Sequence, residues 1–119
     1  MKRLALTIAI CVLAAPALAD NYPLQGKWGQ DPSLEKGPVD CARLKTIEFD
    51  GERRKNSFGG VPDMRAILVT PNGTNAFRVT EEFRTGQVNA RNSTELRQID
   101  ADHAELSQRG GNIKLRRCK

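Results

Sequence analysis

The sequence predicts an all-β protein, either a small antiparallel β-barrel or a sandwich. Most of the chain consists of short alternating or apolar segments separated by Gly, Pro, Asn and Asp, a pattern typical of about six to eight short strands. No segment shows a sustained helical period with end caps. Two cysteines far apart in the sequence, Cys41 and Cys118, are expected to form one disulfide that closes the fold.

Residues 1–19 have the pattern of an export signal. Lys2 and Arg3 form a basic start, residues 4–15 are almost entirely apolar, and Ala17-Leu18-Ala19 supplies a cleavage site before Asp20. The apolar run is too short to span a bilayer, so we expect a cleaved signal rather than a membrane anchor. Residues 20–119 are then predicted to form a single β-barrel domain in the periplasm or as a secreted protein.

Removal of the signal changes the charge balance. The chain has 19 Lys and Arg against 14 Asp and Glu, and two of the basic residues lie in the signal. The remaining net charge is +3. A positive charge of this size keeps a small protein soluble, and it favours at most a weak association with anionic components of the cell envelope.

The number of cysteines also changes when the signal is removed. Cys11 lies in the apolar run and is removed with it, which leaves Cys41 and Cys118 as an even pair in an oxidising compartment. A bridge across so long a loop stabilises a fold by roughly 4 to 5 kcal/mol. The alternative, two free thiols with a redox or metal role, lacks a Cys-x-x-Cys spacing and nearby histidines.

The first half of the chain divides at its turn residues. Residues 20–24 form a polar lead-in, Gly26 begins the segment that contains Trp28, and residues 31–38 read as a loop. Residues 44–50 are a predicted strand with Ile47 and Phe49 on one face. Residues 52–63 combine charged residues with Gly and Pro, so we expect a surface loop.

The second half contains the best predicted hairpin. Residues 64–70 are the most apolar stretch, and the turn at 71–74 leads into residues 75–83, with Phe77, Val79 and Phe83 pointing inward. The segments that follow are weaker strands at 88–92, 94–100, 103–108 and 113–118. The first two of these could also be one long bent strand, and residues 93–99 could form a short helix.

Gly26-Lys27-Trp28 resembles the Gly-x-Trp that opens the first strand of calycin-type barrels, a group that includes lipocalins, avidins and bacterial Inh-type metalloprotease inhibitors. The resemblance implies that the Trp28 indole plugs one end of the barrel. It also implies that Arg116 or Arg117 in the last strand packs across the indole as a cation–π lid. In size, export and its single disulfide the chain is similar to the Inh-type inhibitors, although its bridge would reach the C-terminus.

The sequence lacks the residue patterns of an enzyme. His103 is the sole histidine, lies at a predicted turn, and has no nucleophile motif to accompany it. Glu81 and Glu82 are adjacent, so a strand sends them to opposite faces and they cannot act as an acid–base pair. We expect no metal site and no cofactor. The aromatics fall at core positions, so nucleic-acid binding is not expected either.

These observations predict a non-enzymatic binding protein whose partner is a periplasmic or extracellular protein. Rigid barrels present function on loops and termini, so two contact elements are expected, the N-terminal segment and the 52–63 loop. The candidate contact residues are Asp20, Asn21, Tyr22, Arg53, Arg54, Lys55 and Phe58. The alternatives are a small-ligand carrier and an envelope structural protein that binds an anionic polymer. A carrier would need space that Ile47, Phe49, Leu68, Phe77 and Val79 are expected to fill.

Overall fold

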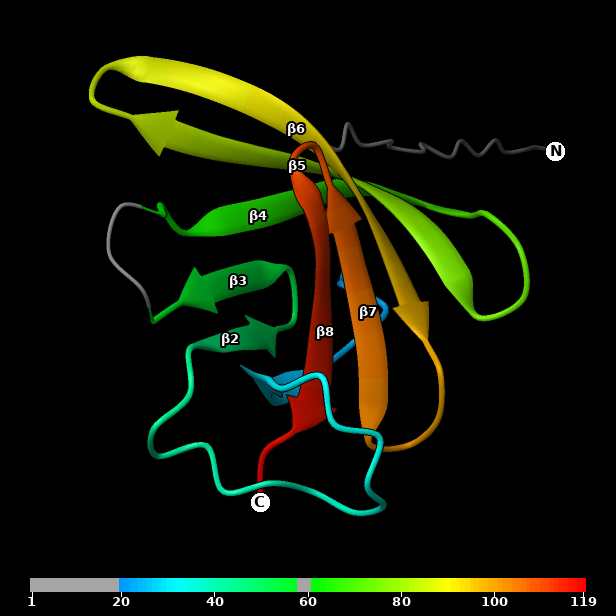
Figure 1. Cartoon of the computed structure of the whole chain (residues 1–119). Coiled ribbons are helices and arrows are strands. Elements are labelled where there is room, and N and C mark those ends of the chain that lie inside the picture. The colour runs from blue at the N-terminus through cyan, green and yellow to red at the C-terminus, as the bar shows by residue number, and fades with distance from the viewer. Residues whose placement is uncertain (1–19, 58–60) are drawn as a thin grey trace, which may run out of the picture.

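The computed structural model describes residues 20–57 and 61–119 and confirms the all-β prediction. Within these residues, eight antiparallel strands form a closed barrel in which the last strand pairs with the first (Figure 1). The architecture is therefore a barrel and not a sandwich. The strands are β1 (Gly26–Gln30), β2 (Thr46–Asp50), β3 (Arg53–Asn56), β4 (Met64–Pro71), β5 (Ala76–Thr85), β6 (Val88–Gln98), β7 (His103–Gln108) and β8 (Gly111–Arg117). The expected export signal, residues 1–19, lies outside the described residues.

The centre of the barrel is filled by apolar side chains from every strand except β3. The two-residue alternation of a strand explains the pattern, since Ile47 and Phe49 are buried on β2 whereas Glu48 between them is exposed. The lead-in before β1 adds two further buried residues. The core consists of Tyr22, Leu24, Trp28, Ile47, Phe49, Ala66, Val79, Leu96, Ala104, Leu106 and Leu115.

A β-bulge in β4 changes which residues enter the core. The register against β5 shifts between Ala66 and Leu68, so the alternation of side chains reverses there. Ala66 is buried, while Leu68 is 53% exposed, and the expectation that Leu68 fills the interior is wrong. Phe77 and Phe83 on β5 are only half-buried, whereas Val79 between them is fully buried.

Two predicted segments differ from the structure. Residues 53–56, expected within a surface loop, form β3, which pairs with β2 through four residues and with β4 through two. Residues 88–98 form one long strand, β6, that pairs with β5 through ten residues, which excludes a helix at 93–99. Charged residues mark both segments, so their strand character depends on backbone pairing rather than on an apolar pattern.

The long β5–β6 hairpin extends past the ends of its neighbours. β6 pairs with β7 only from Glu95 to Gln98, so among the residues that the structure describes β5 is the only strand partner of residues 88–94. We call the corresponding part of the hairpin, residues 79–94, the arm. In Figure 1 the arm projects from the barrel wall beyond the tip of the β7–β8 hairpin.

The opposite end of the barrel is closed by the predicted disulfide. Cys41 in the loop before β2 is bonded to Cys118 directly after β8, across a separation of 77 residues. The absent side chain of Gly29 makes room for this closure, because a Cβ atom there would lie 2.7 Å from the Cys41 sulfur and 2.8 Å from Leu44 Cδ1. A disulfide of this kind indicates a non-reducing environment, as expected for an exported protein. In the described part of the chain, no helix has the length and apolarity that a membrane crossing requires.

Candidate functional site

A surface groove of about 450 Å³ lies where β3 and β4 meet the arm. The register places Arg53, Arg65 and Glu82 beside one another on neighbouring strands, with Arg91 next to Glu82 on β6. These side chains share one face of the sheet, because cross-strand partners point to the same side. The groove is lined by Arg53, Asp63, Met64, Arg65, Glu82, Phe83, Arg84 and Asn89.

The groove is rich in arginine. Glu82 lies 3.3 Å from Arg65 and 4.0 Å from Arg91, so one carboxylate is shared between two guanidinium groups. Arg53 and Arg84 have no ion-pair partner among the described residues. Exposed guanidinium groups of this kind can bind carboxylates in a bidentate manner. The groove can therefore bind carboxylate groups.

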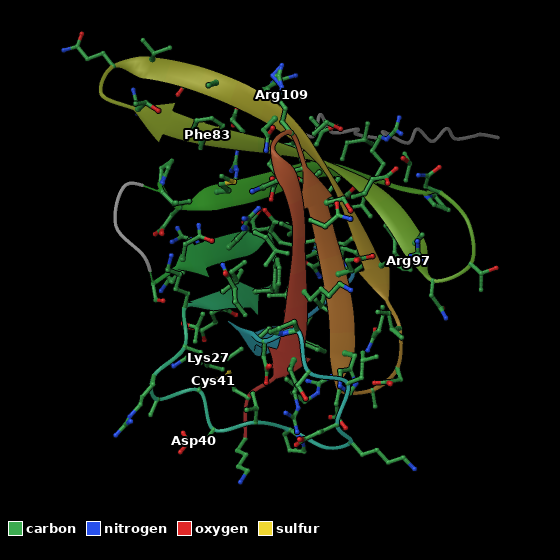
Figure 2. The ribbon with its side chains drawn as sticks, in the orientation of Figure 1. Lys27, Asp40, Cys41, Phe83, Arg97 and Arg109 are labelled. Carbon is green, nitrogen blue, oxygen red and sulfur yellow. A yellow bond between two sulfur atoms is a disulfide. The ribbon has the colours of Figure 1, made fainter. Side chains whose placement is uncertain are left out.

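Apolar side chains accompany these charges. Phe83 is paired with Met64 on one side and with Ala90 on the other, and all three are half-buried. Val88 at the end of the arm is 63% exposed. Figure 2 shows Phe83 on the arm, remote from Lys27 and Cys41 at the disulfide end. The combination of aromatic, methionine and arginine side chains is typical of protein contact surfaces.

A buried polar cluster supports the base of the arm. Arg54 Nη1 lies 2.9 Å from Glu81 Oε2, and both side chains are almost completely buried. The hydroxyl of Thr94 donates to Glu81 Oε1 at 2.7 Å, and the amide of Asn92 donates to the same oxygen at 3.3 Å. The carboxylate therefore links β3, β5 and β6. Its position opposite to that of Glu82 confirms that the two adjacent carboxylates occupy different faces.

Tyr22 completes the cluster from the N-terminal lead-in. Its hydroxyl donates to Glu81 Oε2 at 2.7 Å, and its ring lies 4.9 Å from that of Phe49. Burial raises the pKa of Tyr22 far above its ordinary value of 10.0, and the neighbouring Glu81 carboxylate raises it further. Tyr22 therefore stays protonated and acts as a hydrogen-bond donor that ties the lead-in to the barrel.

The N-terminal segment is packed against the barrel. Tyr22 is 2% exposed, so the expectation that its side chain contacts a partner is wrong. The backbone of Asp20 donates to Ala66 O, and its carboxylate accepts from Val69 N at 2.8 Å. These bonds occupy part of the β4 edge. Of the three predicted contact residues in the N-terminal segment, Asn21 is exposed, Asp20 is half-buried and Tyr22 is buried.

The predicted basic contact run is divided by strand alternation. Arg53 and Lys55 are exposed on β3, whereas Arg54 between them is 1% exposed and binds Glu81. The expectation that Arg54 contacts a partner is therefore wrong, and of the three only Arg53 lines the groove. Phe58, the fourth predicted contact in this region, lies outside the described residues.

The closed end of the barrel has the predicted cation–π pair. The guanidinium of Arg117 lies 4.5 Å from the centre of the Trp28 ring, and Trp28 is completely buried. The indole N–H donates to Gln25 O at 2.9 Å. Of the two arginines considered for this role, the structure therefore selects Arg117.

Arg116 has a different role. Its Nε donates to Gly37 O at 2.8 Å, and its Nη1 lies 3.2 Å from Asp31 Oδ2. Arg116 thus holds the long loop between β1 and β2 against β8. Both arginines stabilise the closed end, which is distant from the groove (Figure 2).

His103 is buried rather than exposed at a turn. It is 5% exposed at the start of β7, and its Nδ1 lies 2.8 Å from Asp100 Oδ1. The hydrogen bond with His103 lowers the pKa of Asp100 below its ordinary value of 3.8. The His103 side chain therefore packs into the barrel wall and fixes the β6–β7 turn through Asp100. No group of three or more His, Cys, Asp or Glu suited to a metal ion occurs among residues 20–57 and 61–119.

Comparison with known proteins gives no relative for this chain. No protein-family model matches the sequence, and neither a curated protein nor a solved structure is significantly similar to it.

Proposed function

We propose that this protein is an exported, non-enzymatic binding protein that engages another protein in the periplasm or outside the cell. The observation that carries the proposal is the groove beside the arm, which combines uncompensated arginines with the half-buried Phe83 and Met64. Such a surface suits an acidic protein partner with some apolar side chains. The similarity of Gly26-Lys27-Trp28 to the calycin-type inhibitor barrels points to the same class of function.

The packing of the interior favours surface binding over the carriage of a small ligand. Trp28, Phe49 and Leu106 occupy the middle of the barrel with exposed fractions of 0–2%. The buried Arg54–Glu81 pair lies beneath the arm and has its hydrogen bonds satisfied by protein groups. A small-molecule site of ordinary size needs several hundred Å³ of enclosed space, which these side chains occupy.

The structure also changes which elements are expected to make the contact. The N-terminal segment contributes to stability through Tyr22 and Asp20, so we assign it no part in recognition. The groove and the arm take that role, together with Arg53 from the originally expected 52–63 region. Arginine at the centre of a contact surface contributes more to affinity than most other residue types.

A capture experiment tests this proposal. The mature protein is immobilised and exposed to periplasmic extract from its own cells, and bound proteins are identified after chemical cross-linking. The Arg84→Glu variant reverses a groove charge, and Lys27→Glu makes the same change on β1 at the other end of the barrel. Loss of a cross-linked partner with Arg84→Glu but not with Lys27→Glu supports the proposal. Equal capture by both variants, or no partner for the unmodified protein, contradicts it.

A further inference from the structure

We propose that the free edge of β6 in the arm binds an extended acidic segment of the partner protein by β-strand addition. This inference rests on the proposed protein-binding function and specifies how binding occurs. Its physical basis is a stretch of strand, residues 88–94, that has a neighbouring strand on one side only within residues 20–57 and 61–119. Unpaired backbone groups at such an edge are a template for another strand.

The hydrogen-bond pattern identifies the backbone groups that face the open side. Gln98 N donates to Asn75 O in the direction of β5, and Ile99 N donates to His103 O in the direction of β7. The β5–β6 register continues without interruption to Thr85 and Val88. Since hydrogen-bonding direction alternates along a strand, the N–H and C=O groups of Asn89, Arg91 and Ser93 face the open edge. Three residues therefore offer donors and acceptors to an incoming strand.

The edge is accessible at both ends. A hollow of about 260 Å³ lies at the point where β6 and β7 separate, and its lining includes Ser93, Ser107 and Arg109. At the other end of the edge, Val88 and Asn89 are exposed. Figure 1 shows the arm curving away from the β7–β8 tip, and Figure 2 places Arg109 at that tip. An extended segment can therefore lie along residues 88–94 without displacing part of the barrel.

The side chains at the edge indicate the chemistry of the segment. The Arg91 side chain is 68% exposed on one face of β6. Arg84 lies on the neighbouring strand β5, and Arg109 lies at the end of the open edge where β6 and β7 separate. Val88 and Ala90 alternate with these polar positions and present small apolar groups on the other face. A strand added here places every second side chain near the arginines and the remaining side chains near Val88 and Ala90. The expected occupant alternates acidic and apolar residues.

The same charges disfavour a second copy of this protein as the occupant. In the antiparallel register that pairs all three open-edge residues of β6 with those of a second copy, Asn89 lies opposite Ser93 and the two Arg91 side chains lie opposite each other. Like charges in directly opposed positions destabilise a strand pair. Arginine on an open edge is a known means of preventing self-association, and here it also selects an acidic strand.

A synthetic peptide, Val-Glu-Val-Glu-Val-Glu-Val, tests the inference directly. We expect NMR titration to shift the amide signals of Asn89, Arg91 and Ser93 and to slow their hydrogen exchange, whereas a peptide with Lys in place of Glu causes neither effect. Asn89→Pro removes an edge N–H that β5 does not use, so it leaves the barrel folded and weakens peptide binding by about tenfold. Asn89→Ala removes the same side chain from the groove but keeps the N–H, so it is the matched control, and Asn89→Pro should bind the peptide about tenfold more weakly than Asn89→Ala.

The outcomes separate this inference from the proposed function. Peptide shifts confined to Arg53 and Arg65 in the groove, undiminished binding by Asn89→Pro, or no shifts at millimolar peptide would each overturn strand addition. Capture of the natural partner from periplasmic extract is measured in parallel for the unmodified protein, Asn89→Pro and Asn89→Ala. Capture by the unmodified protein that Asn89→Pro leaves intact overturns the inference and retains the function. Edge binding of the peptide without any captured partner supports strand addition and contradicts the function as proposed.

Discussion

Arg54 on β3 and Glu81 on β5 form an ion pair at 2.9 Å that is sealed inside the barrel beneath the arm. The two strands are separated by β4, which contributes the small Ala66 opposite Glu81 and so leaves room for the arginine to reach across. Asn92 and Thr94 on β6 and Tyr22 in the lead-in donate further hydrogen bonds to the Glu81 carboxylate. The cluster therefore fixes the position from which the arm extends.

Removal of one partner from this pair should be strongly destabilising. Glu81→Ala leaves the Arg54 guanidinium buried without a counter-charge, and we expect the free energy of unfolding to fall by about 3 to 5 kcal/mol. The double variant Arg54→Met, Glu81→Leu removes both charges and should cost less than Glu81→Ala alone. Urea unfolding followed by circular dichroism measures both. A double variant less stable than Glu81→Ala would show that the pair has no such coupling.

Tyr22 should make the protein sensitive to alkaline pH. Its pKa is raised in the folded state, so its contribution to stability is complete below the ordinary value of 10.0 and is lost as pH rises above it. It is the only tyrosine, so absorbance at 295 nm reports its ionisation alone. We expect the tyrosinate signal to appear together with unfolding and not before it. Ionisation at pH 10 with an intact near-ultraviolet dichroism spectrum would contradict this prediction.

The stabilising contribution of Asp100 should be lost in acid, whereas that of Tyr22 is lost in alkali. Its pKa is lowered in the folded state by the hydrogen bond with His103, so the contribution is complete above the ordinary value of 3.8 and is lost as pH falls below it. Asp100→Asn should therefore be less stable than the unmodified protein at pH 6, and the difference should shrink by pH 3. Asp40→Asn, a change of the same kind in the β1–β2 loop, is the control. Equal differences at both pH values would exclude this coupling.

Much of the barrel could be predicted because local patterns determine it. The turn residues at 71–74 mark a hairpin that the structure contains, and the Cys41–Cys118 bridge follows from the count of cysteines. The cation–π lid was implied by resemblance, and the structure chooses Arg117 over Arg116 because strand alternation allows only one of two adjacent residues to face Trp28.

The site was harder to predict because it depends on tertiary context. Arg53-Arg54-Lys55 reads as a solvated run, and its strand character arises only from pairing with β2 and β4. Glu81 could have been suspected from the sequence, since it shares its strand face with Phe77 and Val79, which were expected to point inward. The open edge of β6 could not, because it results from the different lengths of β6 and β7 in the closed sheet.

The disulfide should provide a large part of the net stability. Chain-entropy reasoning gives about 4.5 kcal/mol for a loop of this length, a substantial share of the ordinary total for a small domain. We expect Cys41→Ala, Cys118→Ala to lower the urea midpoint strongly while the far-ultraviolet spectrum retains its β character. Reduction of the unmodified protein by dithiothreitol should give the same midpoint. An unchanged midpoint in both experiments would assign the stability to the core alone.

The Trp28–Arg117 contact should be visible in fluorescence. Trp28 is the only tryptophan, and Arg117 covers its ring at 4.5 Å. Arg117→Ala removes the cation and lets water reach the indole, so we expect a red-shifted emission and a loss of about 0.5 to 2 kcal/mol in the free energy of unfolding. Arg117→Lys should recover part of the stability, since lysine retains the charge but lacks the planar group that stacks on the ring. Arg109→Ala at the exposed β7–β8 tip is the matched arginine control and should change neither quantity. Emission that stays at the unmodified wavelength in Arg117→Ala would show that the barrel end is sealed without this arginine.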